Sequence, residues 1–235
     1  MRGMEITLEA RDGAPATPAF AMIPPDAKRG VVIVHEIFGR QPEIDRVVER
    51  FAKNGYAAVA PDLFHRGRFA CLYDVFRTMK TGHGPGVAIA QGRNARAWLC
   101  EKAAIPVERV GLIGFCFGGG YALMAGAGWG AVSTNYGLIP SVEAMRGVGP
   151  VIGCYGAKDK QFRGMGEVLK KRLAKLGQTP EVHMFEDAGH SFLTDGQYPV
   201  AGKLWRGLNV GDYPEAREEG WRRIFAFFEQ HLALA

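Results

Sequence analysis

The feature that most constrains the fold is a regular alternation of short apolar segments with amphipathic ones along nearly the whole chain. Apolar runs such as 30–34 and 56–60 are typical of parallel strands that are buried on both faces. Segments between them, such as 42–54, place apolar residues at helical spacing. The alternation therefore predicts an α/β fold, with a mostly parallel sheet and helices on both of its faces.

The predicted elements follow one another from the N-terminal region to the last residues. Strands are expected at 5–8, 30–35, 56–60, 109–114, 131–136, 150–156 and 181–185. Helices are expected at 42–54, 85–102, 118–128, 162–176 and 214–232. No compositional break, low-complexity linker or internal repeat divides the 235 residues, so we expect one domain, 1–235. Within it, residues 64–86 are less regular and rich in Arg, Gly and His, which is typical of a cap or binding loop.

Composition excludes several classes of protein. Hydrophobic residues make up 47% and charged residues 23%, as in an ordinary globular chain. The net charge of +5 comes from scattered side chains without a basic run, so no nucleic-acid partner is expected. No apolar stretch approaches the roughly 18 residues that span a bilayer, and the first residues lack the apolar core of a secretory signal. We therefore expect a cytoplasmic protein that does not bind membranes.

The four cysteines lie far apart, at positions 71, 100, 116 and 154, and none belongs to a Cys-x-x-Cys pair. This spacing argues against a zinc ribbon and against a thioredoxin-type dithiol. A chain of this length buries enough apolar surface to fold without disulfides. A reducing compartment is the expectation that follows.

One cysteine lies where a nucleophile is expected. Segment 114–120 has the sequence Gly-Phe-Cys-Phe-Gly-Gly-Gly; it follows a predicted strand and begins a predicted helix. This is the Gly-x-nucleophile-x-Gly turn, with Cys116 as the nucleophile. The dipole of the following helix favours the Cys116 thiolate. A phosphate-binding turn is the less favoured alternative, since neither Gly-x-Gly-x-x-Gly nor a P-loop is present. A buried cysteine in a glycine-bearing packing turn also stays open.

An acid and a histidine follow Cys116 in the order that such a triad requires. Asp159 comes after the strand at 150–156, and His190 comes after the last predicted strand. Both positions lie at the carboxyl edge of the sheet, where open α/β folds bind their ligands. Asp187 is a weaker candidate for the acid. The remaining histidines belong to other places, a strand, the last helix and the irregular segment: His183, His231, His65 and His83.

With these motifs in view, the chain resembles the dienelactone hydrolase family of α/β hydrolases from about residue 5 to its end. The resemblance rests on four segments in order. These are His-Glu-Ile-Phe-Gly at 35–39, Gly-Tyr-Ala-Ala-Val-Ala-Pro-Asp-Leu at 55–63, the Gly-Phe-Cys-Phe-Gly-Gly turn, and Ala-Gly-His-Ser-Phe at 188–192. The family's catalytic triad then corresponds to Cys116, Asp159 and His190.

The resemblance implies further roles. Glu36 would contact the nucleophile and hold or accept the thiol proton until substrate arrives. The backbone N–H groups of Ile37 and Phe117 would form the oxyanion hole, as expected for a loop after an early strand and the residue after the nucleophile. No metal and no cofactor are expected, because His35-Glu-x-x-Gly lacks the second histidine of a zinc-protease helix.

The chain departs from the family at one position. Family members that hydrolyse dienelactone hold its carboxylate with arginines, one of them four residues after the catalytic histidine, where this chain has Thr194. Dienelactone itself is therefore not expected as the substrate. Arg66 and Arg68, with Phe38 and Tyr136, are the candidate substrate-binding residues. If such arginines face the pocket, an anionic substrate follows.

Three hypotheses on function result. The first is a hydrolase that cleaves a small lactone, ester or thioester through an acyl-cysteine intermediate, as a monomer or small homo-oligomer. The second is a catalytically silent binding or sensing protein with the same fold. The third, a thiol redox protein, needs Cys154 as a resolving partner, although its place on a strand is more typical of a core residue.

Overall fold

A computed structural model describes residues 2–64, 67–83, 86–194 and 209–233. Its centre is an eight-stranded sheet with the order β1-β2-β4-β3-β5-β6-β7-β8. The strands β4, β3, β5, β6, β7 and β8 run parallel, and β1 and β2 add an antiparallel edge. The bounds are β1 Met4–Leu8, β2 Thr17–Met22, β3 Arg29–Val34, β4 Tyr56–Pro61, β5 Val110–Phe115, β6 Ala131–Asn135, β7 Val151–Gly156 and β8 Glu181–Phe185. The predicted, mostly parallel sheet is confirmed.

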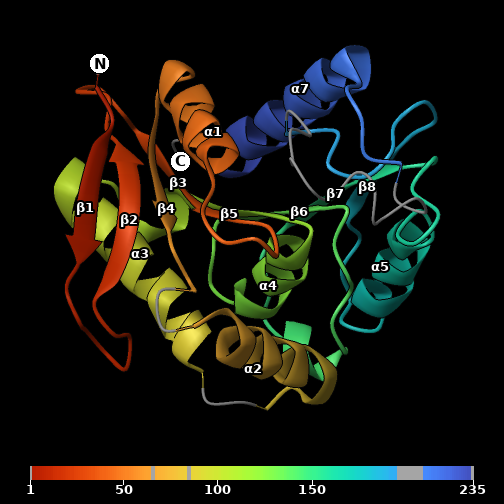
Figure 1. Cartoon of the computed structure of the whole chain (residues 1–235), viewed down its shortest axis with the longest axis horizontal. Coiled ribbons are helices and arrows are strands. Elements are labelled where there is room, and N and C mark those ends of the chain that lie inside the picture. The colour runs from red at the N-terminus through yellow and green to blue at the C-terminus, as the bar shows by residue number, and fades with distance from the viewer. Residues whose placement is uncertain (1, 65–66, 84–85, 195–208, 234–235) are drawn as a thin grey trace.

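Helices cover both faces of this sheet. Their bounds are α1 Pro42–Lys53, α2 Arg68–Thr81, α3 Val87–Ala103, α4 Phe117–Ala125, α5 Met165–Ala174 and α7 Pro214–His231. In Figure 1, α1 and α7 lie above the sheet, and α2, α3, α4 and α5 lie below it. Among the described residues, no helix combines the length and the apolar character that a membrane crossing needs.

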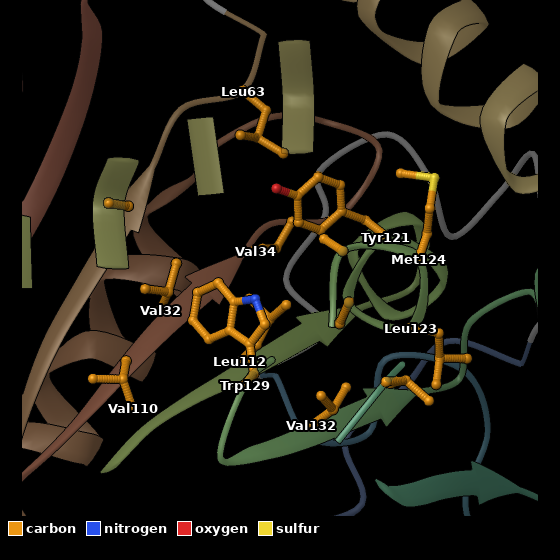
Figure 2. Packing of buried hydrophobic residues seen from close by; sticks show 14 of the residues in the cluster. Val32, Val34, Leu63, Val110, Leu112, Tyr121, Leu123, Met124, Trp129 and Val132 are labelled. Carbon is orange, nitrogen blue, oxygen red and sulfur yellow. The ribbon is translucent and has the colours of Figure 1, made fainter. Parts of the chain in front are cut away.

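The strand sequences are apolar throughout because both sides of the sheet are buried. Along β5, Leu112 packs into the core below the sheet, whereas Ile113 and Phe115 pack into the core above it. Figure 2 shows part of the lower core, which includes Leu112 and the indole of Trp129. Continuous burial of this kind explains why the parallel strands could be recognised from apolar runs rather than from alternation.

The structure corrects the sequence analysis at two places. The segment expected to be irregular, 64–86, contains the 14-residue helix α2. Its buried residues Val75, Thr78 and Met79 are few, and exposed aromatic residues on the opposite face hid the helical period. The strand β2 was missed because Pro18 lies within it and most of its side chains are small, so that its alternation is weak. It forms a strand by pairing antiparallel with both β1 and β4.

Candidate active site

The turn between β5 and α4 holds Cys116 in a conformation that a residue with a side chain rarely adopts, with φ 52° and ψ −111°. The surrounding backbone forces this turn. A Cβ atom on Gly114 would lie 1.8 Å from the carbonyl oxygen of Gly118, and one on Gly118 would lie 2.4 Å from that of Val34. The glycines of the motif therefore allow a close approach that leaves Cys116 half-buried at the tip of the turn.

Asn135, at the end of β6, fixes the same turn from the neighbouring strand. Its carbonyl oxygen accepts a hydrogen bond from the Cys116 N–H at 3.0 Å. Its side-chain Nδ2 donates to the carbonyl oxygen of Gly114, also at 3.0 Å. The sequence analysis did not single out Asn135, and its place at the carboxyl end of a strand was the one available signal.

Asp159 and His190 meet at the carboxyl edge of the sheet. The Nδ1 of His190 lies 2.6 Å from Oδ2 of Asp159, and both residues are buried. The other carboxylate oxygen of Asp159 accepts the backbone N–H groups of Gln161 and Phe162 at 3.1 and 3.2 Å. The alternative acid, Asp187, is exposed and pairs with Lys158 instead. The geometry thus gives His190 the partner that chain order indicated.

The imidazole of His190 is buried among groups that favour its charged form. Burial by itself lowers the pKa of His190, but Cys116, Asp159 and Glu36 outweigh it and raise that pKa to about 10. The Nε2 atom is buried and makes no hydrogen bond within the described part of the chain. The other ring nitrogen, Nδ1, is the one that faces Asp159. The arrangement favours the imidazolium form of His190.

Glu36, at the carboxyl end of β3, is nearly fully buried and receives three hydroxyl groups. Tyr136 Oη and Thr194 Oγ1 each lie 3.4 Å from its Oε1, and Ser191 Oγ lies 3.3 Å from its Oε2. Tyr136 and Ser191 both have positive φ, 41° and 59°, so their backbones are held in strained conformations at this place. These three hydroxyl-bearing side chains surround the carboxylate of Glu36. Ser191, which directly follows His190, was not singled out by the sequence analysis.

His35 fixes the loop that carries Glu36. The backbone N–H of Leu63 donates to its Nε2 at 3.1 Å, so the proton is on Nδ1, which donates to the carbonyl oxygen of Glu36 at 2.7 Å. Burial lowers the pKa of His35, against smaller opposing effects of the Glu36 carbonyl and of Asp62. His35 is therefore a neutral link between the ends of β3 and β4, and it was not predicted.

The two predicted oxyanion-hole donors lie on neighbouring segments. Phe117 is the first residue of α4. The first backbone N–H groups of a helix have no hydrogen-bond partner within the helix, so that of Phe117 can donate elsewhere. Ile37 follows Glu36 directly, and the first turn of α4 touches this segment, since Gly118 lies against the carbonyl groups of Val34 and His35. The first turn of α4 thus lies beside the segment that leads into Ile37.

The candidate substrate-binding residues are placed differently from one another. Arg68 is exposed at the start of α2, and its Nη2 donates to the carbonyl oxygen of Phe38 at 3.2 Å. Tyr136 is fully buried, with its ring 4.9 Å from that of His190. Arg66 lies outside the described residues, as does His65. Arg68 is thus the predicted arginine that the described structure brings beside the Glu36 loop.

The other histidines and cysteines that the sequence analysis named have different surroundings in the described part of the chain. His183 is half-buried beside Glu181, His231 packs on Phe227 at the end of α7, and His83 is exposed. All four cysteines are free thiols, and full burial raises the pKa of Cys154. Within the described ranges, no three His, Cys, Asp or Glu side chains are grouped so that they could hold a metal ion.

Fold and geometry together define a class of protein. An α/β hydrolase from a Medee basin deep-sea metagenome library, MGS-M1, has the same fold with a TM-score of 0.72 at 14% identity, over 100% of this chain and 99% of that one. A dienelactone hydrolase-like promiscuous phosphotriesterase from metagenomic libraries gives 0.76 at 20% identity, over 98% of each chain. The chain has the α/β-hydrolase fold.

The family follows from the sequence comparison. The model of the dienelactone hydrolase family matches residues 17–232. A carboxymethylenebutenolidase of Rhodococcus opacus is 27% identical over 232 residues, which cover 87% of this chain and 82% of that protein. This chain belongs to the dienelactone hydrolase family and is a hydrolase of the carboxylic ester and lactone class.

The first prediction concerns the turn. Replacing Gly114 with alanine should lower the free energy of unfolding by about 3 kcal/mol or more, because the new Cβ meets backbone that cannot move aside. Urea unfolding measures the loss. Gly164→Ala is the matched control: nothing lies within 4 Å of its Cβ position, so its effect should stay within about 1 kcal/mol. Equal effects of the two substitutions would contradict the close approach.

The second prediction concerns His35, whose folded pKa is lowered below the ordinary value of about 6.5. The unfolded chain binds a proton that the folded chain does not, so this histidine makes the protein lose stability as the pH falls below about 6.5. The stability difference between wild type and His35→Asn should therefore shrink by about 1 kcal/mol from about pH 7.5 to about pH 5.5. Denaturant unfolding at each pH checks this, and a difference independent of pH would refute it.

Proposed function

We propose that this protein hydrolyses a small lactone, ester or thioester through an acyl-cysteine intermediate, with Cys116, Asp159 and His190 as its catalytic triad. The observation that supports this most directly is the buried imidazole of His190, hydrogen-bonded to Asp159 at 2.6 Å and electrostatically coupled to Cys116. Family membership supports the ester and lactone class of substrate.

In the acylation step, the Cys116 thiolate attacks the carbonyl carbon of the substrate, and the carbonyl oxygen gains the negative charge. The N–H groups of Ile37 and Phe117 donate to that oxyanion. When the tetrahedral intermediate collapses, the bond to the leaving oxygen or sulfur breaks, and His190 gives it the imidazolium proton. The product is the acyl-cysteine and a free alcohol, thiol or, for a lactone, the hydroxyl end of the same molecule.

In the second step, water attacks the acyl-cysteine while His190 takes its proton. The Cys116 thiolate then leaves, and the carboxylic acid product is released. Asp159 acts on both steps by holding the imidazole with Nε2 toward Cys116 and by stabilising its positive charge. A thiolate is a good leaving group, so activated esters, thioesters and lactones suit this site better than amides.

One position distinguishes this chain from relatives that hydrolyse dienelactone, and its side chain contacts Glu36. Glu36 raises the pKa of His190 and so helps to keep the imidazole protonated in the resting state; its role as acceptor of the thiol proton belongs to the same proposal. Thr194, where an arginine would be expected to hold a substrate carboxylate, donates instead to Glu36. We therefore do not propose dienelactone as the substrate.

The third prediction tests the nucleophile. Cys116→Ala should lower kcat/KM for phenyl acetate at least about 1,000-fold, because no other residue supplies the attacking thiolate. Far-UV circular dichroism should show an unchanged fold. Cys100→Ala, at a partly buried cysteine on α3, is the matched control and should keep its activity. Full activity of Cys116→Ala would reject the acyl-cysteine mechanism, and an inactive wild type over a panel of esters and lactones would favour the silent binding protein.

The fourth prediction follows from the raised pKa of His190. Because the imidazole stays protonated up to about pH 10, it can protonate the leaving group over the neutral range and loses this ability only above that pH. The alkaline limb of kcat/KM for phenyl acetate should therefore lie near pH 10. Asp159→Asn removes a hydrogen-bonded anion and should move that limb down by at least about one pH unit.

Stopped-flow initial rates, corrected with Cys116→Ala as the background, measure both profiles. An alkaline limb near the ordinary histidine pKa of about 6.5 in the wild type would contradict the imidazolium form of His190. An unchanged limb in Asp159→Asn would remove Asp159 from the triad.

A further inference from the structure

Helix α2 presents large apolar side chains to the outside as well as to the core. Phe69, Tyr73 and Phe76 follow each other at four- and three-residue spacing, which puts them on one face of the helix. They are exposed to 87%, 67% and 37%, respectively. The degree of exposure falls along the helix toward Phe76, which is therefore the aromatic residue that is partly covered by another part of the molecule.

A groove lies at the partly covered end of this face. Its volume is about 300 Å³, and it runs between α2, the segment after β6, and α5. Met79 and Ile139 are buried in it, whereas Phe76 and Leu138 are partly exposed beside them. The lining residues are mostly apolar: Phe76, Met79, Lys80, Leu138, Ile139, Ser141 and Arg172.

Both walls of the groove touch the turn that carries Cys116. On the α2 side, the ring of Phe76 lies edge-on to the ring of Phe117, with 5.9 Å between the centroids. On the other side, Leu138 follows Gly137, where an added Cβ would lie 2.7 Å from the carbonyl oxygen of Cys116. The groove therefore lies beside the first turn of α4.

The segment after β6 is held in place by polar contacts rather than by packing alone. Arg172 Nη1 donates to the carbonyl oxygens of Ile139 and Pro140 at 2.5 and 2.7 Å. The N–H of Ser141 donates to the carbonyl oxygen of Met79 at 2.8 Å and so joins this segment to α2. The groove is thus formed before any ligand enters, which lowers the entropy lost on binding.

We propose that this groove binds an apolar alkyl or aryl group on one side of the scissile carbonyl, so that the substrates are esters, thioesters or lactones with an apolar chain. The inference rests on the proposed function and names its substrate class. An apolar chain in the groove would cover Phe76 and Leu138, and each methylene moved out of water favours binding by a factor of about four at most.

The experiment measures kcat/KM over two series of substrates. In the first, the acyl part of phenyl esters grows from acetyl through butanoyl to hexanoyl. In the second, the thiol part of alkyl thioacetates grows from ethyl through butyl to hexyl. The wild type should prefer the longest member over the shortest at least about tenfold in one of the series, within the limit set by the gain per methylene.

Leu138→Asn, at a side chain that is 44% exposed, should reduce this preference to about a third or less and leave the rate on the shortest substrate unchanged. Phe76→Ala is a second variant with the same expected loss of preference. Phe69→Ala is the matched control, because it removes an exposed aromatic residue of the same helix that does not line the groove. It should keep the wild-type preference.

The outcomes separate the two proposals. Cys116-dependent hydrolysis with no preference in either series, or a preference that survives both Leu138→Asn and Phe76→Ala, overturns the groove and leaves the proposed function intact. Absence of hydrolysis of every phenyl ester and thioester by the wild type overturns the proposed function, and the inference with it. If Phe69→Ala also lost the preference, the alkyl chain of the substrate would bind on the exposed face of α2 instead. That result would also overturn the proposal that the groove binds it.

Discussion

The contact on which the rest of the site depends is the one between the first turn of α4 and the ends of β3 and β5. Gly118 lies against the carbonyl groups of Val34 and His35, and Gly114 lies against Gly118, so the chain must turn sharply between them. That turn holds Cys116 at positive φ and brings Phe117 beside the loop with Glu36 and Ile37. The strain at Cys116 is tolerated because strands buried on both faces and the hydrogen bonds of Asn135 fix the surrounding backbone.

Around this turn, the molecule combines buried charges that depend on each other. Taking His190 out of water disfavours its charged form, yet Cys116, Asp159 and Glu36 together reverse that effect. Asp159 is in turn held by two backbone N–H groups, and Glu36 by three hydroxyls. His35 in contrast is kept neutral by burial and links two strand ends. The two histidines thus have opposite charge states because their surroundings differ.

Much of the fold followed from the sequence because its signals are local. The parallel strands are continuous apolar runs, and α1 and α7 show apolar residues at helical spacing. The helix α2 was mistaken for irregular chain because Phe69, Tyr73 and Phe76 lie on its outer face, so its sequence does not separate an inner from an outer side. Likewise β2 belongs to the antiparallel edge, where pairing with β1 and β4, rather than its own composition, makes it a strand.

The sequence by itself determined the order of the strands and helices other than β2 and α2, the glycine-flanked turn at Cys116 and the chain order of cysteine, aspartate and histidine, since each depends on spacing along the chain. Only the tertiary structure decided that Asp159 rather than Asp187 meets His190, and that Thr194, Ser191 and Tyr136 surround Glu36. It alone showed the groove between α2 and the segment after β6. Such groupings join residues many positions apart, and their distances are set by how helices pack on the sheet, which no local pattern of residues specifies.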